Sequence, residues 1–179
     1  MNFQKFFEKL VKDVAVDTTD AFDRNFDDES FFGDKWKKNR AGTQTLNKHG
    51  VAGLRGSINY VISGNTINFK SSKPYAKIHN EGGDIIVTQK MKSYFWAMYY
   101  KSAGAIQIKK DGTQSNTQRN TRLSAEAQKW KSLAQLKVGS KMKMPQRQFI
   151  GSHPQLSKRI EEVILHNLKE NNILTNIKK

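Results

Sequence analysis

The sequence predicts an α+β fold, in which a small antiparallel β-sheet packs against long N-terminal and C-terminal helices, with further helices inserted in residues 88–137. Two patterns carry this prediction. Apolar residues recur at three- and four-residue steps near both ends of the chain, which is typical of amphipathic helices. Between these ends, apolar and polar residues alternate over residues 58–70, which is typical of half-buried strands.

The first helix is expected to begin at Phe3 and to cover about 25 residues, because neither Pro nor Gly interrupts the pattern before Gly33. Its apolar stripe consists of Phe3, Phe7, Leu10, Val14, Thr18, Phe22 and Phe26, widened by Phe6 and Val11. The acidic residues at its C-terminal end are Asp23, Asp27, Asp28 and Glu29. Because the helix dipole disfavours negative charge there, we expect the last turn to fray unless basic groups face it.

The strand signal of residues 58–70 predicts a β-hairpin whose two-residue turn is Gly64–Asn65, since glycine readily adopts a positive φ. The expected register pairs Ser63 with Thr66, Ile62 with Ile67, and Tyr60 with Phe69. This register places the apolar side chains on one face and leaves the other face polar. The preceding residues 33–53 are expected to form a loop around Trp36, because glycines interrupt a polar stretch.

Shorter elements are expected in the rest of the chain. Pro74 is expected to open a helical turn that Gly82–Gly83 ends. The others are strands over 84–88, 105–108 and 138–144, helices over 90–101 and from Leu123 to Ala134, and a polar loop over 109–120. A last helix is expected to begin with a capping box of Ser152 and Gln155. Its buried stripe would be Leu156, Ile160, Val163, Ile164 and Leu168, with Ile173 and Ile177 in a basic tail.

The composition narrows the class of protein. The chain has 179 residues, enough for one domain, and 36% of them are hydrophobic, so a core is expected but a small one. The absence of cysteine excludes disulfide scaffolds, thiolate zinc sites and a cysteine nucleophile. No apolar run reaches the roughly 18–20 residues of a membrane span, and the N-terminus lacks a signal-peptide core. We therefore expect a soluble intracellular protein that does not bind membranes.

The charge is unevenly distributed. The formal net charge is +15, yet residues 1–34 contain four basic and nine acidic side chains, a net charge of −5. The remaining residues contain 27 basic and seven acidic side chains, a net charge of +20. Such a distribution favours nucleic acid, anionic surfaces or acidic proteins as partners.

Residues 88–143 form the most basic region, with 12 basic and two acidic side chains. Aromatic residues are interleaved with them, which is compatible either with stacking on single strands or with a buried helical face. The spacing of Met91, Phe95, Met98 and Tyr99 favours the buried face. The candidates for contact with phosphates or with an acidic partner are Lys109, Lys110, Arg119 and Arg122.

The motifs of common enzymes are absent from the sequence. The four histidines are scattered, and there is no P-loop, dinucleotide fingerprint or Gly-x-Ser-x-Gly elbow. No RNA-recognition, helix-turn-helix or zinc-finger motif occurs either, which disfavours sequence-specific recognition of nucleic acid. His79, Glu81 and Asp84 imitate a catalytic cluster, but nothing supplies a nucleophile. We predict no catalytic residues, no metal site and no cofactor.

Two segments carry a resemblance to a known family. The first runs from Tyr75 to Gly83 and the second from Met144 to Gly151, ahead of the final helix. Their order and motifs resemble the phage virion morphogenesis family, the tail-completion or head–tail joining proteins of Mu-like phages. The matching residues are Tyr75, Ala76, Ile78, His79, Gly82 and Gly83 in the first segment and Pro145, Arg147, Phe149 and Gly151 in the second. Residues 88–143 align with no motif of that family.

The motif residues also suit ordinary structural roles. Tyr75 and His79 are four residues apart and share one helical face, and His79 is placed to donate to a backbone carbonyl. Arg147 is suited to bind a carboxylate through two hydrogen bonds. We therefore favour structural or subunit-interface roles over catalysis for this set.

The resemblance implies a structural protein of the virion neck, assembled in the host cytoplasm. Such proteins form rings, commonly hexamers, that cap the tail tube as tail terminators and join it to the head connector or stopper, with DNA passing through the lumen. Residues 1–179 would then be a single head–tail joining domain with a basic insertion at about 88–143. We further hypothesise that the acidic end of the first helix contacts the basic body of an adjacent subunit.

Two alternatives come from other classes. A nonspecific basic nucleic-acid-binding protein is distinguished by a DNA affinity that falls steeply with salt, without affinity for tail components. An enzyme such as a nuclease is the least favoured hypothesis. It would show a metal-dependent activity that is lost when His79, Glu81 or Asp84 is replaced.

Overall fold

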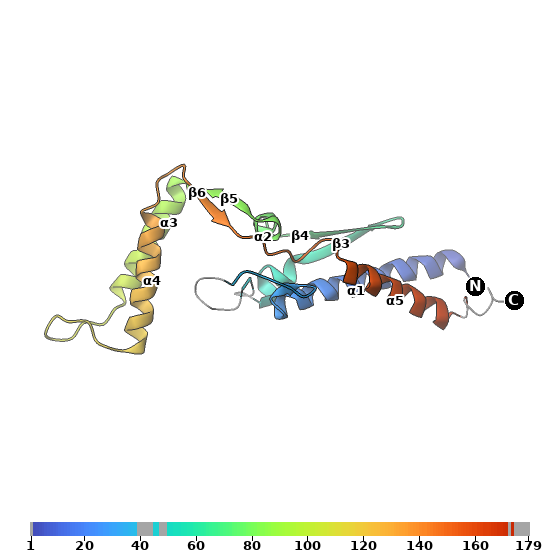
Figure 1. Ribbon diagram of the computed structural model, residues 1–179, viewed down its shortest axis with the longest axis horizontal. Coiled ribbons are helices and arrows are strands. Elements are labelled where there is room, and N and C mark those ends of the chain that lie inside the picture. Colours follow the sequence, from blue (N-terminus) through green and yellow to red (C-terminus); the bar gives the residue numbers. More distant parts are fainter. Residues whose placement is uncertain (1, 39–44, 47–49, 172, 174–179) are drawn as a thin grey trace. The chain divides into compact units, whose positions relative to one another are not determined.

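The structure is a computed structural model that describes residues 2–38, 45–46, 50–171 and 173, and it confirms the α+β class (Figure 1). The helices are α1 (Phe3–Asp27), α2 (Ala76–Glu81), α3 (Gln89–Gly104), α4 (Gln118–Ala134) and α5 (Pro154–Glu170). The strands are β1 (Ser30–Phe31), β2 (Asp34–Lys35), β3 (Ile58–Ser63), β4 (Thr66–Ser71), β5 (Gly83–Ile86) and β6 (Lys141–Met144). They pair as β1–β2, β3–β4 and β5–β6, three separate ribbons where we expected one sheet.

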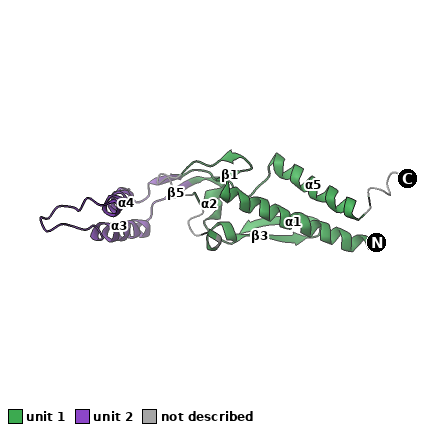
Figure 2. Ribbon diagram, turned by 90° about the horizontal axis from the view of Figure 1, so that it is seen from below, with its two compact units in different colours: residues 1–83, 144–179 green, residues 84–143 purple. Residues whose placement is uncertain are grey.

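The chain divides into two compact units, coloured separately in Figure 2. Unit 1 consists of residues 1–83 and 144–179, and unit 2 consists of residues 84–143. Unit 2 nearly coincides with the basic insertion expected at 88–143 and contains both predicted inserted helices. That residues 1–179 act as one domain stays a prediction. None of the helices in the described part of the chain combines the length and apolar character needed to cross a lipid bilayer.

The first helix has the predicted bounds and length, 25 residues. The side chain of Asn2 caps it by accepting a hydrogen bond from the Lys5 amide, which satisfies one of the free N–H groups of the first turn. Its stripe supports two buried clusters in unit 1. One cluster contains Phe26, Trp36, Leu54, Ala76 and Phe149, and the other contains Phe22, Phe31 and Leu156.

The acidic end of α1 is partly compensated within the chain, because one guanidinium faces two of its four carboxylates. The Arg55 guanidinium binds both Asp23 and Asp27, donating from Nε to Asp23 Oδ1 at 2.7 Å and from Nη2 to Asp27 Oδ2 at 2.8 Å. Glu29 Oε1 accepts a hydrogen bond from the Thr45 amide at 2.6 Å. A basic group does therefore face the last turn, as the dipole argument required, and it belongs to the same chain.

The prediction of a loop over 33–53 is wrong at its start, because Asp34–Lys35 is a strand paired with Ser30–Phe31. The turn between them is Phe32–Gly33, with φ of +50° and +102°, and two successive positive φ values suit the right-handed twist of a hairpin. The Asn25 side chain accepts from the Phe32 amide at 3.0 Å and holds this turn. Within the predicted loop, 50–52 is a 3-10 turn, and 39–44 and 47–49 lie outside the described residues.

The β3–β4 hairpin has the predicted register, with Ser63 opposite Thr66. Its base packs on α1, where the Phe69 and Phe22 rings meet edge to face at 5.3 Å. Val61, on the face expected to be polar, is 48% exposed. The expected apolar face is only partly covered near the turn, where Ile62 is 38% exposed and Ile67 opposite it is half-buried.

Unit 2 is a pair of helices packed on each other. Phe95 is buried and stacks on Trp130 at 6.0 Å, so the interpretation of this face as core is confirmed for Phe95. The expected strand over 105–108 is wrong, since the described residues show only an isolated bridge from Ile108 to Gln114. The backbone of Gln107 bonds instead to the buried side chain of Asn120.

Two further boundaries differ from the prediction. Helix α4 begins at Gln118, inside the expected loop, because Thr117 caps it. The capping box of the last helix is also wrong: His153 is the N-cap residue and its Nδ1 accepts from the Gln155 amide at 3.2 Å. Pro154 occupies the first helical position, which proline favours, and so moves the cap one residue past Ser152.

The buried stripe of α5 is only partly as expected. Leu156 is buried, whereas the other predicted positions are half-buried: Ile160, Val163, Ile164 and Leu168. Arg159 ties α5 to α1 by donating two hydrogen bonds of 2.6 Å to the carboxylate of Asp17. Ile173, expected in the basic tail, is half-buried, and Ile177 lies outside the described residues.

Candidate functional site

The two motif segments lie against each other within unit 1. We call residues 75–83 and 144–151 together the motif junction. The Arg147 amide donates to the His79 carbonyl at 2.7 Å. The Asn80 side-chain oxygen accepts from two successive amides, Phe149 at 2.9 Å and Ile150 at 3.0 Å. Segments more than 60 residues apart in sequence are therefore joined by hydrogen bonds at both backbone and side chain.

The motif junction is anchored in a buried core. Phe149 is fully buried, and its ring lies 5.3 Å from that of Phe26. Ala76 belongs to the same cluster. The Trp36 indole N–H donates to the Gln148 carbonyl at 2.7 Å, so the tryptophan fills the core while its one polar group is satisfied.

Arg147 is a buried cation at this junction, with only 7% of its surface exposed. Its Nε donates to the backbone carbonyl of Lys37 at 2.8 Å. Burial lowers the pKa of the guanidinium, and the negative charge of Glu29 opposes that shift. The expectation that Arg147 binds a carboxylate through two hydrogen bonds is not met among the described residues, where its acceptor is a carbonyl.

Tyr75 and His79 share one face of α2, as predicted from their spacing. Their rings meet edge to face at 6.0 Å. His79 Nδ1 is buried and has no hydrogen-bond partner among the described residues. Desolvation lowers the pKa of this imidazole, and the positive charge of Arg147 lowers it further. His79 is therefore held neutral, and it is the His79 carbonyl that pairs across the junction.

Gly82 is required where the two segments approach most closely. Its φ is +72°, and a Cβ atom there would lie 2.8 Å from the backbone nitrogen of Gln146. No side chain fits in that space without moving the backbone. The remaining predicted residues complete the junction: Ile78 and Pro145 are half-buried, and Gly83 and Gly151 have positive φ values.

These contacts identify the motif set as internal to one chain. Ala76, Arg147 and Phe149 are buried, whereas Tyr75 is 43% exposed. A structural role for the set agrees with these contacts and stays a prediction. Contact between the exposed part and another subunit stays a prediction.

Comparison with known families matches the family model described as the phage virion morphogenesis family to residues 29–169. This span covers most of the chain and includes both segments of the motif junction. The protein belongs to the phage virion morphogenesis family. No curated protein matches the chain, and no solved structure matches it. The family match begins just after α1 and includes the whole of unit 2.

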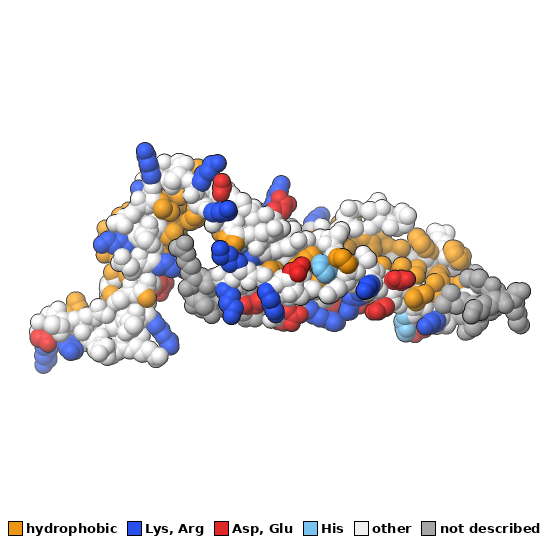
Figure 3. All heavy atoms as spheres, in the orientation of Figure 1, with side chains coloured by type: hydrophobic (Ala, Val, Ile, Leu, Met, Phe, Trp, Pro, Cys, Tyr) orange, Lys and Arg blue, Asp and Glu red, His pale blue; other side chains and the backbone are white. Residues whose placement is uncertain are grey.

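Unit 2 of this family member carries the predicted basic candidates on its surface. Lys109 and Lys110 are exposed in the loop between α3 and α4, and Arg119 and Arg122 are exposed on the first turns of α4. Arg119 and Arg122 are three residues apart and therefore neighbours on one side of the helix. Figure 3 shows Lys and Arg side chains projecting from the visible face of this unit, with few acidic ones beside them.

The acidic groups of unit 2 leave most of this positive charge uncompensated. Asp84 pairs with Lys141 at 3.6 Å. Asp111 accepts from the Thr113 amide and hydroxyl, which lower its pKa, and Glu126 accepts from the Trp130 indole. Among the described residues, the other lysines and arginines of unit 2 form no ion pair. Unit 2 is therefore a strongly cationic surface that suits an anionic partner.

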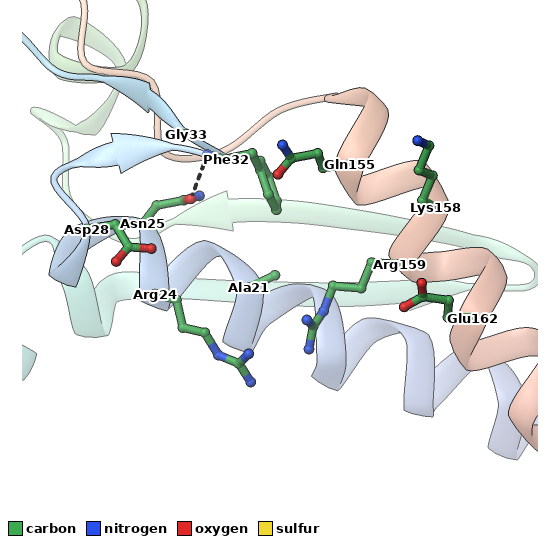
Figure 4. Close-up of a pocket in the computed structure, with 10 residues that line it drawn as sticks. All are labelled: Ala21, Arg24, Asn25, Asp28, Phe32, Gly33, Gln155, Lys158, Arg159 and Glu162. Atoms are coloured by element: carbon green, nitrogen blue, oxygen red, sulfur yellow. Dashed lines mark hydrogen bonds between the residues drawn. The ribbon is translucent and has the colours of Figure 1, made fainter.

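An open cleft of about 420 Å³ lies between α1, the β1–β2 turn and α5 (Figure 4). Its walls present both charges, with Arg24 and Lys158 facing the same space as Asp28 and Glu162. None of the predicted site residues lines it. Across the described residues, no three His, Asp or Glu side chains are grouped closely enough to hold a metal ion.

The long-range contacts of two residues were missed in the sequence. Asn80 lies inside the first motif, and its side chain accepts hydrogen bonds from two amides of the second. Arg55 lies outside the junction and binds Asp23 and Asp27 at the end of α1. The only signal for either was a polar side chain within an otherwise apolar or glycine-containing motif, which does not reveal a partner far along the chain.

The depressed pKa of His79 predicts a pH-dependent stability. In the unfolded chain the imidazole has its ordinary pKa of 6.5, so below about that pH the unfolded state binds more protons than the folded state. The free energy of unfolding is therefore expected to fall as the pH drops from 6.5 through the lower folded value. Urea denaturation at about pH 8 and pH 5.5 measures this loss.

Replacement of His79 by glutamine is expected to reduce that loss. The comparison at the higher pH, where the imidazole is neutral in both states, reports the packing cost of the substitution alone. The prediction is tested only by the change in the free energy of unfolding between the two pH values, compared between the wild type and His79→Gln. Equal losses in the wild type and in His79→Gln would show that another group is responsible.

Proposed function

We propose that this protein is a tail terminator or tail completion protein of the phage neck. Copies assemble into a ring, expected to be a hexamer, that caps the tail tube and joins it to the head connector or stopper protein, with DNA passing through the lumen. The observation that carries this proposal is the family match over residues 29–169, which contains both motif segments in order. The role is structural and involves no cofactor and no turnover.

The cationic surface of unit 2 supports a contact with the anionic components of such a neck. Lys109, Lys110, Arg119 and Arg122 are exposed and are the residues we propose to meet DNA or acidic faces of the tail tube and connector. Long basic side chains without internal partners bind phosphates by releasing counterions, whatever the base sequence. The same observation is the one that favours nonspecific nucleic-acid binding as a second function.

The acidic end of α1 is a weak candidate for the contact between neighbouring subunits. Asp23 and Asp27 already bind Arg55, and Asp17 already binds Arg159. Charges that are compensated within one chain contribute little attraction to another. The hypothesis that this end contacts the basic body of an adjacent subunit stays a proposal, because one guanidinium compensates only part of its negative charge.

The proposal is tested in the phage that encodes this protein. Inactivation of the gene is expected to leave filled heads and tails unjoined in electron micrographs, and the intact gene supplied in trans should restore joined particles. Immunogold labelling of an exposed tag should mark the junction of head and tail. Infectious particles formed without the protein, or label away from the neck, would refute the proposal.

The second function has its own readout. Purified protein that binds duplex DNA with an affinity falling steeply with salt, and that shows no affinity for isolated tails, would favour nonspecific nucleic-acid binding. Binding to isolated tails at a salt concentration that abolishes DNA binding would favour the neck role.

A further inference from the structure

Within the β3–β4 hairpin the one charged side chain is Lys70, at the base of β4, in a chain that is otherwise highly charged. Residues 58–69 contain no Asp, Glu, Lys or Arg, although such residues make up 26% of the sequence. Asparagine, serine and threonine are the polar residues of this segment, and its other side chains are mainly large and apolar. We call residues 58–69 the uncharged hairpin.

The tip of the uncharged hairpin is open on one face and partly covered on the other. Val61 is 48% exposed on the first face. Successive side chains of a strand point to opposite faces, and on the second face Ile62 is 38% exposed while Ile67 opposite it is half-buried. The base is different, because Phe69 packs on Phe22 and anchors the hairpin to α1. Figure 1 shows the β3–β4 ribbon running on to its turn beyond this anchored base.

Both edges of the uncharged hairpin are also open. Within the described residues, β3 and β4 pair only with each other. An exposed strand edge readily pairs with another chain, and proteins that must avoid this place lysine, proline or inward-pointing charge on the edge. The ribbon has one such residue, the exposed Lys70 at its base, and none between there and the turn. A two-stranded ribbon is itself marginally stable and gains from a further covering surface.

The charge of the chain identifies the occupant. Two copies that each carry a net charge of +15 repel one another overall, and an uncharged patch adds nothing to that repulsion where it forms the contact. DNA or an acidic protein would instead be drawn to the cationic unit 2 and would gain no attraction at this patch. We infer that the uncharged hairpin is the surface on which a second copy of this chain docks.

This inference rests on the proposed function for its biological setting, since a ring requires a contact between copies. It names the residues of that contact, with Val61 and Ile62 at its centre. It is an alternative to the acidic end of α1, where Asp23 and Asp27 share the Arg55 guanidinium.

The test uses sedimentation velocity of the full chain over a concentration series to about 100 μM, in salt high enough to screen repulsion. The test variant is Val61→Lys with Ile62→Lys. The matched control is Tyr94→Lys with Ile108→Lys, which adds the same charge at positions of unit 2 that are 55% and 67% exposed. Circular dichroism and thermal denaturation verify that each variant is folded.

The wild type and the control are expected to associate, and the test variant is expected to associate about tenfold or more weakly, because charges placed in the contact would be buried without partners. Should the lysine variant unfold, Val61→Thr with Ile62→Thr keeps strand-forming residues and is expected to weaken association in the same direction. A folded hairpin variant that associates as tightly as the wild type would overturn the inference, and so would a wild type that remains monomeric throughout.

Failure of this inference can be distinguished from failure of the proposed function. Unchanged association of the hairpin variant together with correct labelling of the neck would remove the uncharged hairpin from the ring contact and keep the neck role. Association through the hairpin by a protein that is absent from the neck would support the contact and refute the role.

Discussion

Replacement of Phe149 by alanine is expected to lower the free energy of unfolding of unit 1 by about 3–5 kcal/mol. The ring is fully buried, and it packs on Phe26 at 5.3 Å in a cluster that also contains Trp36. Alanine would lose this burial and leave a cavity beneath the motif junction. Because Asn80 holds the backbone amides of residue 149 and of Ile150, the segment is poorly able to collapse into the space.

Urea denaturation monitored by circular dichroism measures this loss. Tyr75→Ala is the matched control, because it removes an aromatic ring from the same junction at a position that is 43% exposed. Its cost should be about 1 kcal/mol or less. A loss for Phe149→Ala no greater than that of the control would mean that the cluster around Phe26 does not hold the junction together.

Replacement of Gly82 by alanine is expected to cost about 3 kcal/mol or more. One part is the strain of a non-glycine residue at a φ of +72°. The larger part is steric, because the new Cβ atom would lie 2.8 Å from the nitrogen of Gln146, which belongs to the backbone and is not free to rotate away. The segments of the junction would have to separate, weakening the bonds from His79 and Asn80.

Gly64→Ala separates the two parts of that cost. Gly64 has a φ of +60°, and a Cβ atom there would meet nothing within 4 Å. It should therefore show the strain alone, about 1–2 kcal/mol. Denaturation of both variants under the same conditions gives the steric part as the difference between them. Equal losses would show that the close approach of Gln146 is not a constraint on the junction.

Local patterns were sufficient for the elements whose contacts are close in sequence. The uninterrupted stripe that begins at Phe3 predicts α1, and the alternation around Gly64–Asn65 predicts the hairpin with its register. Both elements follow from a regular spacing of apolar residues within one short segment, so the sequence of that segment is sufficient to predict them. The family resemblance added the motif residues, which the structure places together at one junction.

The parts that sequence reasoning missed depend on partners far along the chain. The β1–β2 hairpin turns at Phe32–Gly33, which lacks the usual asparagine or aspartate. Its positive φ at Phe32 is tolerated because the ring stacks on His153 at 5.1 Å and because Asn25 holds the amide. Gln107 likewise avoids a strand because the buried Asn120 binds its backbone. No local pattern contains such information.

The pairing of β5 with β6 has an evolutionary consequence. The chain leaves the body of the molecule at Gly83 and returns at Met144, and the two strands at these points are hydrogen-bonded to each other. Because residues 84–143 begin and end at strands that pair with each other, a change in the length of this segment need not disturb the fold of unit 1. We therefore expect members of the family to differ more in the segment between these strands than in the residues of unit 1.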